Sequence, residues 1–122
     1  MNIINWYSVV KIKNPAILML SYMIAGIESD FNKNAVGGVG EVGLFQIRPE
    51  YYPSLKTDNS IENQVKCFLD LMNKNVIYLS SKGYQVNFNN LLRVWNGGLG
   101  GMHLESVNNY IEKYRKKYFW FN

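Results

Sequence analysis

Cysteine and histidine are almost absent from this sequence of 122 residues, which contains one of each, Cys67 and His103. A single cysteine excludes a disulfide within the chain. Metal sites built on thiolates or imidazoles need several such residues at fixed spacing, so we expect no metal and no other cofactor. We interpret Cys67 as a buried or half-buried structural thiol and His103 as an exposed loop residue.

Long hydrophobic runs and basic leader segments are also lacking. The apolar stretch 16–27 is too short to span a bilayer, so no membrane insertion is expected. Residues 1–7 place no basic residue ahead of an apolar run, and no signal peptide is visible. The length is typical of one domain, which we assign to residues 1–122 and expect to be a monomer.

Acidic residues are fewer than basic ones, 9 against 13, and the formal net charge is +4. A basic chain suits an anionic partner such as a nucleic acid, an acidic membrane surface or a cell-wall polymer. No nucleic-acid-binding motif accompanies the charge, so no nucleic-acid partner is expected. The cationic cluster at 113–117 is interpreted as a solvated helix face. The high aromatic content, 15%, fits core packing or a groove that stacks on sugars.

Helical signals dominate, and the fold class is predicted to be mainly α. Asn14 and Pro15 are good first residues for an apolar helix that ends near Glu28 to Asp30. Three further helices are predicted at 61–82, 90–95 and 104–118, the first of them capped by Ser60 and closed by Gly83. Strand signals are weak, and residues 3–12 are compatible with a short helix.

A glycine-rich loop is predicted from about Phe31 to Glu50. Four glycines within seven residues imply unusual backbone conformations or close approach to a ligand. Apolar residues in the loop argue against a flexible linker, because they favour burial. These residues are Val36, Val39, Val42, Leu44, Phe45 and Ile47.

Glu28 is the first candidate for chemistry, because it ends the most apolar helix of the chain. Burial in apolar surroundings and the negative end of the helix dipole both raise the pKa of a carboxyl group. A carboxyl with a raised pKa stays protonated near neutrality and serves as a general acid. The alternative is an ordinary surface glutamate that closes a helix.

Four short motifs follow one another in order. Glu28-Ser29 is followed by an aromatic at the third position after the glutamate, and Gly43-Leu44-Phe45-Gln46-Ile47 begins fifteen residues after Glu28. Trp95-Asn96-Gly97-Gly98 comes next, and Tyr110 lies in the last predicted helix. This ordered set resembles the lytic transglycosylases of glycoside hydrolase family 23, over about residues 15–118.

The resemblance implies a lysozyme-like α-domain with a saccharide-binding groove. It implies that Glu28 is the sole catalytic acid and base, acting on peptidoglycan glycan strands between N-acetylmuramic acid and N-acetylglucosamine. Glu28 would protonate the glycosidic oxygen, and the substrate's N-acetyl oxygen would stabilise the anomeric carbon. Glu28 would then deprotonate the 6-hydroxyl, which closes to a 1,6-anhydro end.

The resemblance also assigns supporting residues. Gln46 is expected to hydrogen-bond the substrate or the loop, Asn96 to orient an acetamido group, and Tyr110 to hold the catalytic carboxyl. Ser29 is expected either to bind substrate or to fix the helix end. Trp95 stands where the family usually has Tyr, and it is expected either to stack on a sugar or to pack.

Two departures from the family pattern leave alternatives open. Glu41 lies in the glycine loop at an offset where goose-type lysozymes, which are hydrolases, carry an acid, so it is a possible second carboxylate that activates water. Against this, Arg48 occupies the position where those enzymes place another acid. Gly37 stands where some family members carry Ser.

A goose-type hydrolase and a non-catalytic peptidoglycan-binding or virion module therefore remain as alternatives. Action on the cell wall, in the periplasm, outside the cell or from a virion, is expected. A phage origin as an endolysin-type enzyme is favoured, because no export signal is visible.

Overall fold

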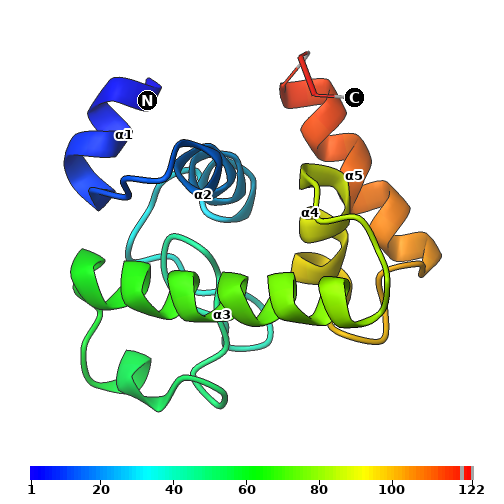
Figure 1. Cartoon of the computed structure of the whole chain (residues 1–122). Coiled ribbons are helices and arrows are strands. Elements are labelled where there is room, and N and C mark those ends of the chain that lie inside the picture. Colours follow the sequence, from blue (N-terminus) through cyan, green and yellow to red (C-terminus); the bar gives the residue numbers. More distant parts are fainter. Residues whose placement is uncertain (119, 122) are drawn as a thin grey trace. The chain divides into compact units, whose positions relative to one another are not determined.

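The computed structural model describes residues 1–118, 120 and 121, and its regular structure is helical (Figure 1). In chain order the elements are α1 (Ile3–Val10), α2 (Pro15–Glu28), the 3-10 helix η1 (Pro53–Lys56), α3 (Ile61–Ser81), α4 (Phe88–Gly97) and α5 (Glu105–Lys117). Over these described residues there is no strand, only isolated antiparallel bridges that pair Val42 with Val36 and Ile47. The predicted mainly α class is confirmed, and the helical content is consistent with a lysozyme-like domain.

The chain divides into two compact units, Met1–Leu69 and Asp70–Asn122, and the boundary falls within α3. The first unit contains α1, α2, the glycine-rich loop and η1. The second contains α4, α5 and the segments that connect them. Each unit is described by itself below, and the assignment of one domain to residues 1–122 stays a prediction.

Helix α2 begins where its sequence predicts. The Asn14 side chain accepts a hydrogen bond from the backbone N–H of Ile17 at 3.0 Å, and Pro15 occupies the first turn. The buried residues of the helix lie between Leu20 and Gly26, whereas residues 16–19 near its start are exposed or half-buried and its last two residues are half-buried. Burial of α2 is therefore concentrated in the turns just before Glu28.

The core of the first unit is aromatic around α2. The Trp6 indole of α1 donates a hydrogen bond to the hydroxyl of Ser21 at 2.9 Å, which satisfies two buried polar groups at once. Trp6 also contacts Phe31 and Phe45 edge to face, with ring centroids 5.4 and 6.2 Å apart. Phe45 in turn lies 4.4 Å from the ring of Phe68 on α3. These contacts fix the position of the loop that follows α2.

Helix α3 also has the predicted ends. The Ser60 hydroxyl accepts from the backbone N–H of Asn63 at 3.1 Å, and Gly83 adopts a φ of 77° just beyond the helix. Cys67 is buried, as predicted. Leu69, expected in the apolar stripe of this helix, is 41% exposed instead.

The second unit is organised by α4 and α5, which pack against each other (Figure 1). Helix α4 is longer than predicted, because the Asn87 side chain caps it by accepting from the backbone N–H of Asn90 at 2.9 Å. Arg93 joins the two helices: it donates to the side-chain oxygen of Asn89 and to that of Asn108, each at 2.8 Å. His103 is exposed, as predicted, and its ring lies beside Tyr84.

Two of the apolar loop residues correct the sequence analysis. Leu44, Phe45 and Ile47 are buried as expected, but Val36 and Val39 are 74% and 67% exposed. Both exposed valines stand next to glycines at the tip of the loop, where little chain is available to cover them.

Among the described residues no single helix is long and apolar enough to cross a bilayer. Helices α1 and α2 pass the length and composition test only as a pair, and they are bent by 101° at their junction.

Candidate active site

Glu28 is the last residue of α2, and its side chain is half-buried. The residues just before it, Met23 to Gly26, are buried, so the carboxyl emerges from the apolar core of the first unit. The position is the one that the sequence predicts for a catalytic acid. A partly desolvated carboxyl at a helix C-terminus can donate a proton to a ligand and later accept one.

Ser29 fixes the end of α2 to the glycine-rich loop. Its hydroxyl donates to the carbonyl oxygen of Leu44 at 2.8 Å and accepts from the backbone N–H of Asn32 at 3.2 Å. It also lies 3.2 Å from the carbonyl oxygen of Ala25. All of these partners are backbone groups, so the structure supports a role for Ser29 in positioning its neighbour Glu28.

The chain turns sharply after Ser29. Asp30 and Phe31 both have positive φ, 52° and 63°, in the left-handed region that side chains rarely adopt. For a bulky residue such as Phe31 this conformation costs free energy, and the contacts of its ring with Trp6 and Tyr22 hold it there. This strained turn begins two residues after Glu28.

The glycine-rich loop is anchored by a buried glutamine of α3, Gln64. Its side-chain oxygen accepts from the backbone N–H of Leu44 at 2.8 Å, and its amide nitrogen donates to the carbonyl oxygens of Lys33 and Asn59 at 3.0 and 2.8 Å. Gln64 is 2% exposed; its bond to Leu44 is buried, and its bonds to Lys33 and Asn59 are partly buried. Sequence analysis missed this residue. The available signal was a polar side chain beside the apolar stripe of α3.

Gln46 lies on the same loop and is half-buried. Its φ is 52°, and its amide nitrogen donates to the carbonyl oxygens of Gly43 and Ala35 at 2.9 and 3.2 Å. Of the two predicted roles, bonding to the loop is therefore observed. The side-chain oxygen points to the other side, toward Gly37.

Glu41 does not simply extend into solvent. Its carboxylate accepts from the backbone N–H of Val39 at 3.0 Å and lies directly over Gly37, whose backbone N–H donates to the carbonyl oxygen of Glu41 at 2.8 Å. The first unit therefore contains Glu28, Ser29, Glu41 and Gln46, with the last two side by side at Gly37.

The remaining predicted residues belong to the second unit. Trp95 and Asn96 occupy the last turn of α4, where Trp95 is half-buried and Asn96 is exposed. Gly98 follows with a φ of 75° and ends the helix. Tyr110 is buried on α5, and its hydroxyl lies 2.5 Å from that of Tyr114. Binding roles for Trp95, Asn96 and Tyr110 stay predictions.

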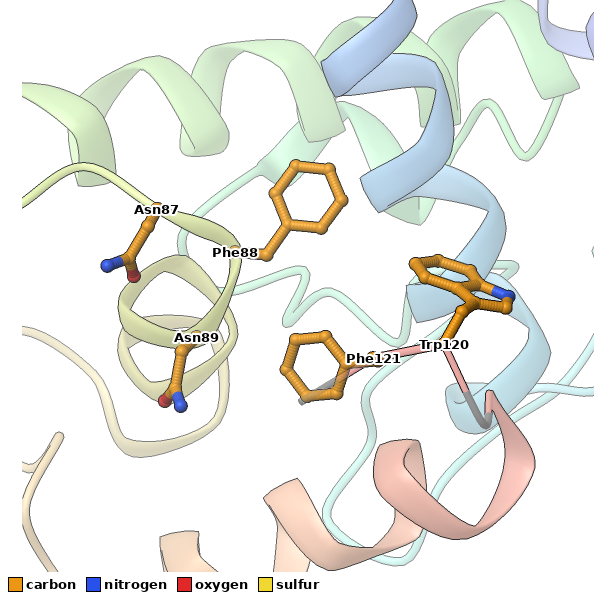
Figure 2. Close-up of a pocket in the computed structure, with 5 residues that line it drawn as sticks. All are labelled: Asn87, Phe88, Asn89, Trp120 and Phe121. Carbon is orange, nitrogen blue, oxygen red and sulfur yellow. The ribbon is translucent and has the colours of Figure 1, made fainter.

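The second unit also carries a hollow of about 420 Å³ at the start of α4, lined by Asn87, Phe88, Asn89, Trp120 and Phe121 (Figure 2). Figure 2 shows that its wall is largely aromatic, while the two asparagine amides point away from the rings. The Asn87 side chain caps α4, and the Asn89 side-chain oxygen accepts a hydrogen bond from Arg93. None of the predicted site residues lines this hollow.

In the described part of the chain, no group of three or more His, Cys, Asp or Glu side chains is placed to hold a metal ion. The first unit instead presents a site of one helix-terminal carboxyl beside a loop fixed by hydrogen bonds. This arrangement is suited to general acid and base catalysis.

Comparison with known families agrees with this type of site. Residues 11–70 match the family model described as the transglycosylase SLT domain. The match spans α2, the glycine-rich loop and the first half of α3, and so includes Glu28, Glu41 and Gln46. Comparisons with curated proteins and with solved structures found no match. The family match supports a lytic-transglycosylase-like family and suggests activity on the peptidoglycan of the cell wall.

Proposed function

We propose that this protein is a lytic transglycosylase that cleaves the β-1,4 bond between N-acetylmuramic acid and N-acetylglucosamine and leaves 1,6-anhydro ends. The observation that carries the proposal is the setting of Glu28. It is a half-buried carboxyl at the end of an apolar helix, tied through Ser29 to the loop at Leu44, inside the segment that matches the SLT domain.

In the proposed reaction Glu28 first acts as an acid. It gives its proton to the glycosidic oxygen as the bond to the anomeric carbon breaks, and the substrate's own N-acetyl oxygen stabilises that carbon. Glu28, now ionised, takes the proton of the muramic acid 6-hydroxyl, whose oxygen bonds to the anomeric carbon. The proton that left Glu28 is thus replaced, no water is consumed, and no second carboxylate is needed.

The other predicted residues have supporting roles in this proposal. Gln46 holds the loop and faces the substrate, and Asn96 orients an acetamido group. Tyr110 holds the catalytic carboxyl in place, and Trp95 stacks on a sugar ring. We further propose membership in glycoside hydrolase family 23, action of a monomer on the cell wall, and a phage origin.

Two measurements test the proposal. Mass spectrometry of digested peptidoglycan should give products that are one water lighter than those of a hydrolase. The Glu28→Gln variant should keep its thermal midpoint and lose at least about 100-fold in rate, which is the usual contribution of a positioned acid. Ordinary reducing ends would overturn the anhydro product, and a near-normal rate for the variant would remove Glu28 from the mechanism.

A goose-type hydrolase is the second candidate, and the placement of Glu41 favours it. The carboxylate lies against the loop beside Gln46, where a bound water would contact both side chains. If Glu41 activates water, Glu41→Gln should lower the fraction of reducing ends among the products while anhydro ends persist.

A further inference from the structure

The net positive charge of the chain belongs to its second unit. Residues 1–69 contain six basic and six acidic side chains, whereas residues 70–122 contain seven basic and three acidic ones, which accounts for the whole formal charge of +4. Four of these seven cations stand at the end of α5, and all four are exposed: Lys113, Arg115, Lys116 and Lys117. A concentration of one sign of charge on a surface attracts anions.

Arg115 differs from the three lysines. Its guanidinium donates to the carboxylate of Glu112 at 2.6 Å, so this cation has an acidic partner on its own helix. Lys113, Lys116 and Lys117 stand at positions i, i+3 and i+4, and therefore lie on one side of α5, where like charges repel. Among the described residues no ion pair joins Lys113 or Lys116 to an acidic side chain. We call these three lysines the basic stripe.

Stabilisation of the helix does not account for the whole stripe. Cations near a helix C-terminus interact favourably with the negative end of the helix dipole, but the effect is confined to the last turn. Lys113 lies ahead of the last turn, which already contains three cations, so its charge adds repulsion rather than stability. The interpretation of this cluster as a solvated helix face leaves that repulsion unexplained, whereas an anionic partner would offset it.

An exposed aromatic side chain lies next to the stripe. The Lys117 ammonium lies 5.9 Å from the centre of the Tyr118 ring, and the Trp120 ring lies 5.8 Å from the same ring. Tyr118 is buried, but Trp120 is 46% exposed. Trp120 also lines the aromatic hollow, together with Phe88 and Phe121 (Figure 2). A cationic and an apolar surface are therefore neighbours at the end of α5.

A lipid bilayer with anionic headgroups offers partners for both surfaces. Lysines near such a bilayer are attracted by its negative surface potential, and tryptophan is enriched at the boundary between headgroups and acyl chains. A soluble phosphodiester polymer would engage the lysines but would leave the apolar surface of Trp120 exposed to water. The pairing of cations with an exposed indole therefore favours the bilayer.

We propose that the basic stripe and Trp120 form a binding surface for anionic phospholipid headgroups, which holds the protein on a bilayer without a spanning segment. The ammonium groups would bind lipid phosphates, and the indole would lie at the level of the headgroups. The choice of a bilayer over other polyanions also rests on the proposed function, because peptidoglycan lies beside a membrane in the bacterial envelope.

Sedimentation of the 122-residue chain with lipid vesicles tests the proposal. Vesicles of equal parts phosphatidylglycerol and phosphatidylcholine are compared with vesicles of phosphatidylcholine alone. The wild type should bind the anionic vesicles roughly 100-fold more tightly at low salt, at about fivefold for each of the three lysines. The difference should largely disappear in about 0.5 M salt, which screens the charges. Equal binding of the two vesicles at low salt would overturn the proposal.

Two triple variants of equal net charge separate a local surface from overall charge. The first combines Lys113→Gln, Lys116→Gln and Lys117→Gln. The control combines Lys13→Gln, Lys56→Gln and Lys66→Gln, at exposed positions of the first unit. The stripe variant should lose most of the preference for anionic vesicles, whereas the control should keep most of it. Equal losses would show that only net charge matters and would reject the stripe. Thermal midpoints check that both variants fold, and the salt titration of the wild type needs no variant.

Tryptophan emission distinguishes a bilayer from a soluble polyanion. On anionic vesicles the emission of the wild type should shift to the blue, because the exposed indole leaves water, and Trp120→Phe should abolish the shift although Trp6 and Trp95 remain. Vesicle binding without this shift would assign the surface to a soluble polyanion and overturn the proposal. So would tighter binding of polyphosphate or of a single-stranded oligonucleotide than of anionic vesicles.

None of these readouts requires cleavage of peptidoglycan. Vesicle binding by a protein that cleaves no glycan would keep the lipid-binding surface and reject the proposed function. Cleavage to anhydro ends by a protein that ignores anionic vesicles would keep the proposed function and reject the surface. The two proposals therefore fail separately.

Discussion

The two glycine-rich segments, 37–43 and 97–101, differ in what occupies the space beside their glycines. At Gly37 and Gly43 the space is filled by polar side chains, Glu41 at 1.9 Å and Gln64 at 2.4 Å from the point where a Cβ would stand. At Gly101 it is filled by backbone, the carbonyl oxygen of Gly97 at 2.2 Å. One segment is therefore a loop held by side-chain hydrogen bonds, and the other is a turn packed backbone on backbone.

Segment 37–43 is therefore suited to binding a ligand, whereas segment 97–101 is suited to structural support. The side-chain oxygens of Glu41 and Gln46 can give up a hydrogen bond within the loop and accept one from a ligand instead, because these side chains move by rotation about single bonds. A backbone contact such as that between Gly97 and Gly101 cannot rearrange without moving α4 or its connection to α5. Substitutions that add one methyl group to each segment test whether this distinction holds.

The largest effect is expected for Gly43→Ala. Gly43 has a φ of 82°, and its new methyl group would meet Gln64, which is buried and satisfies three backbone groups. Backbone strain and the lost hydrogen bonds together should lower the free energy of unfolding by about 3 kcal/mol. Chemical denaturation measures this change. Gln64→Ala should be destabilising alone, and the double variant should be less destabilised than the sum of the two. Strict additivity would show that Gln64 is not the obstacle.

Gly101→Ala should come next, at about 2 kcal/mol, as is typical when a packed site is overfilled. Here the obstacle is the Gly97 carbonyl, so trimming the neighbouring side chain in Leu104→Ala should not restore stability. A rescue by Leu104→Ala would contradict the backbone interpretation and remove the contrast with Gly43. The thermal midpoint of each variant is a sufficient measurement.

Sequence analysis predicted the helix ends that depend on residues close together in the chain. The caps at Asn14 and Ser60 and the stop at Gly83 depend on partners within a few residues, so the bounds of α2 and α3 follow from the chain itself. The contacts of Gln64 with Lys33 and Leu44 cross 31 and 20 residues, and no local pattern specifies them. They become visible only when the helix and the loop are packed.

In the candidate site, too, some features follow from the local sequence and others depend on how distant segments pack. Glu28 was predicted from its helix and from the spacing of the motifs, and in the structure it is half-buried at the end of α2, so that its catalytic role stays a prediction. The orientation of Glu41 was not predictable, because its carboxylate occupies the space that a side chain at Gly37 would take, beside the side-chain oxygen of Gln46. Burial of Val36 and Val39 was predicted wrongly, since apolar character alone does not show which loop residues have a surface to cover them.

Gly37→Ala should lower the free energy of unfolding by about 1 kcal/mol, because the end of the Glu41 side chain can rotate aside, whereas Gln46 Oε1, at 2.6 Å from the new methyl group, is held by two hydrogen bonds of its amide. The thermal midpoint of the variant measures this change. A loss as large as that of Gly101→Ala would show that neither side chain can make room for the methyl group.

The smallest effect is expected at Asp58, ahead of α3 in the first unit. The backbone N–H of Ser60, and secondarily its hydroxyl, donate to this carboxylate and hold the pKa of Asp58 below its usual value of about 3.9. Because the pKa is lowered by folding, the stabilisation is fully present above the ordinary pKa and is lost as the pH falls through the folded value. An NMR titration of the Asp58 carboxyl measures this directly. In Ser60→Ala only the weaker donor is removed, so the pKa should return part of the way. A complete return would show that the hydroxyl, not the backbone, is the main cause.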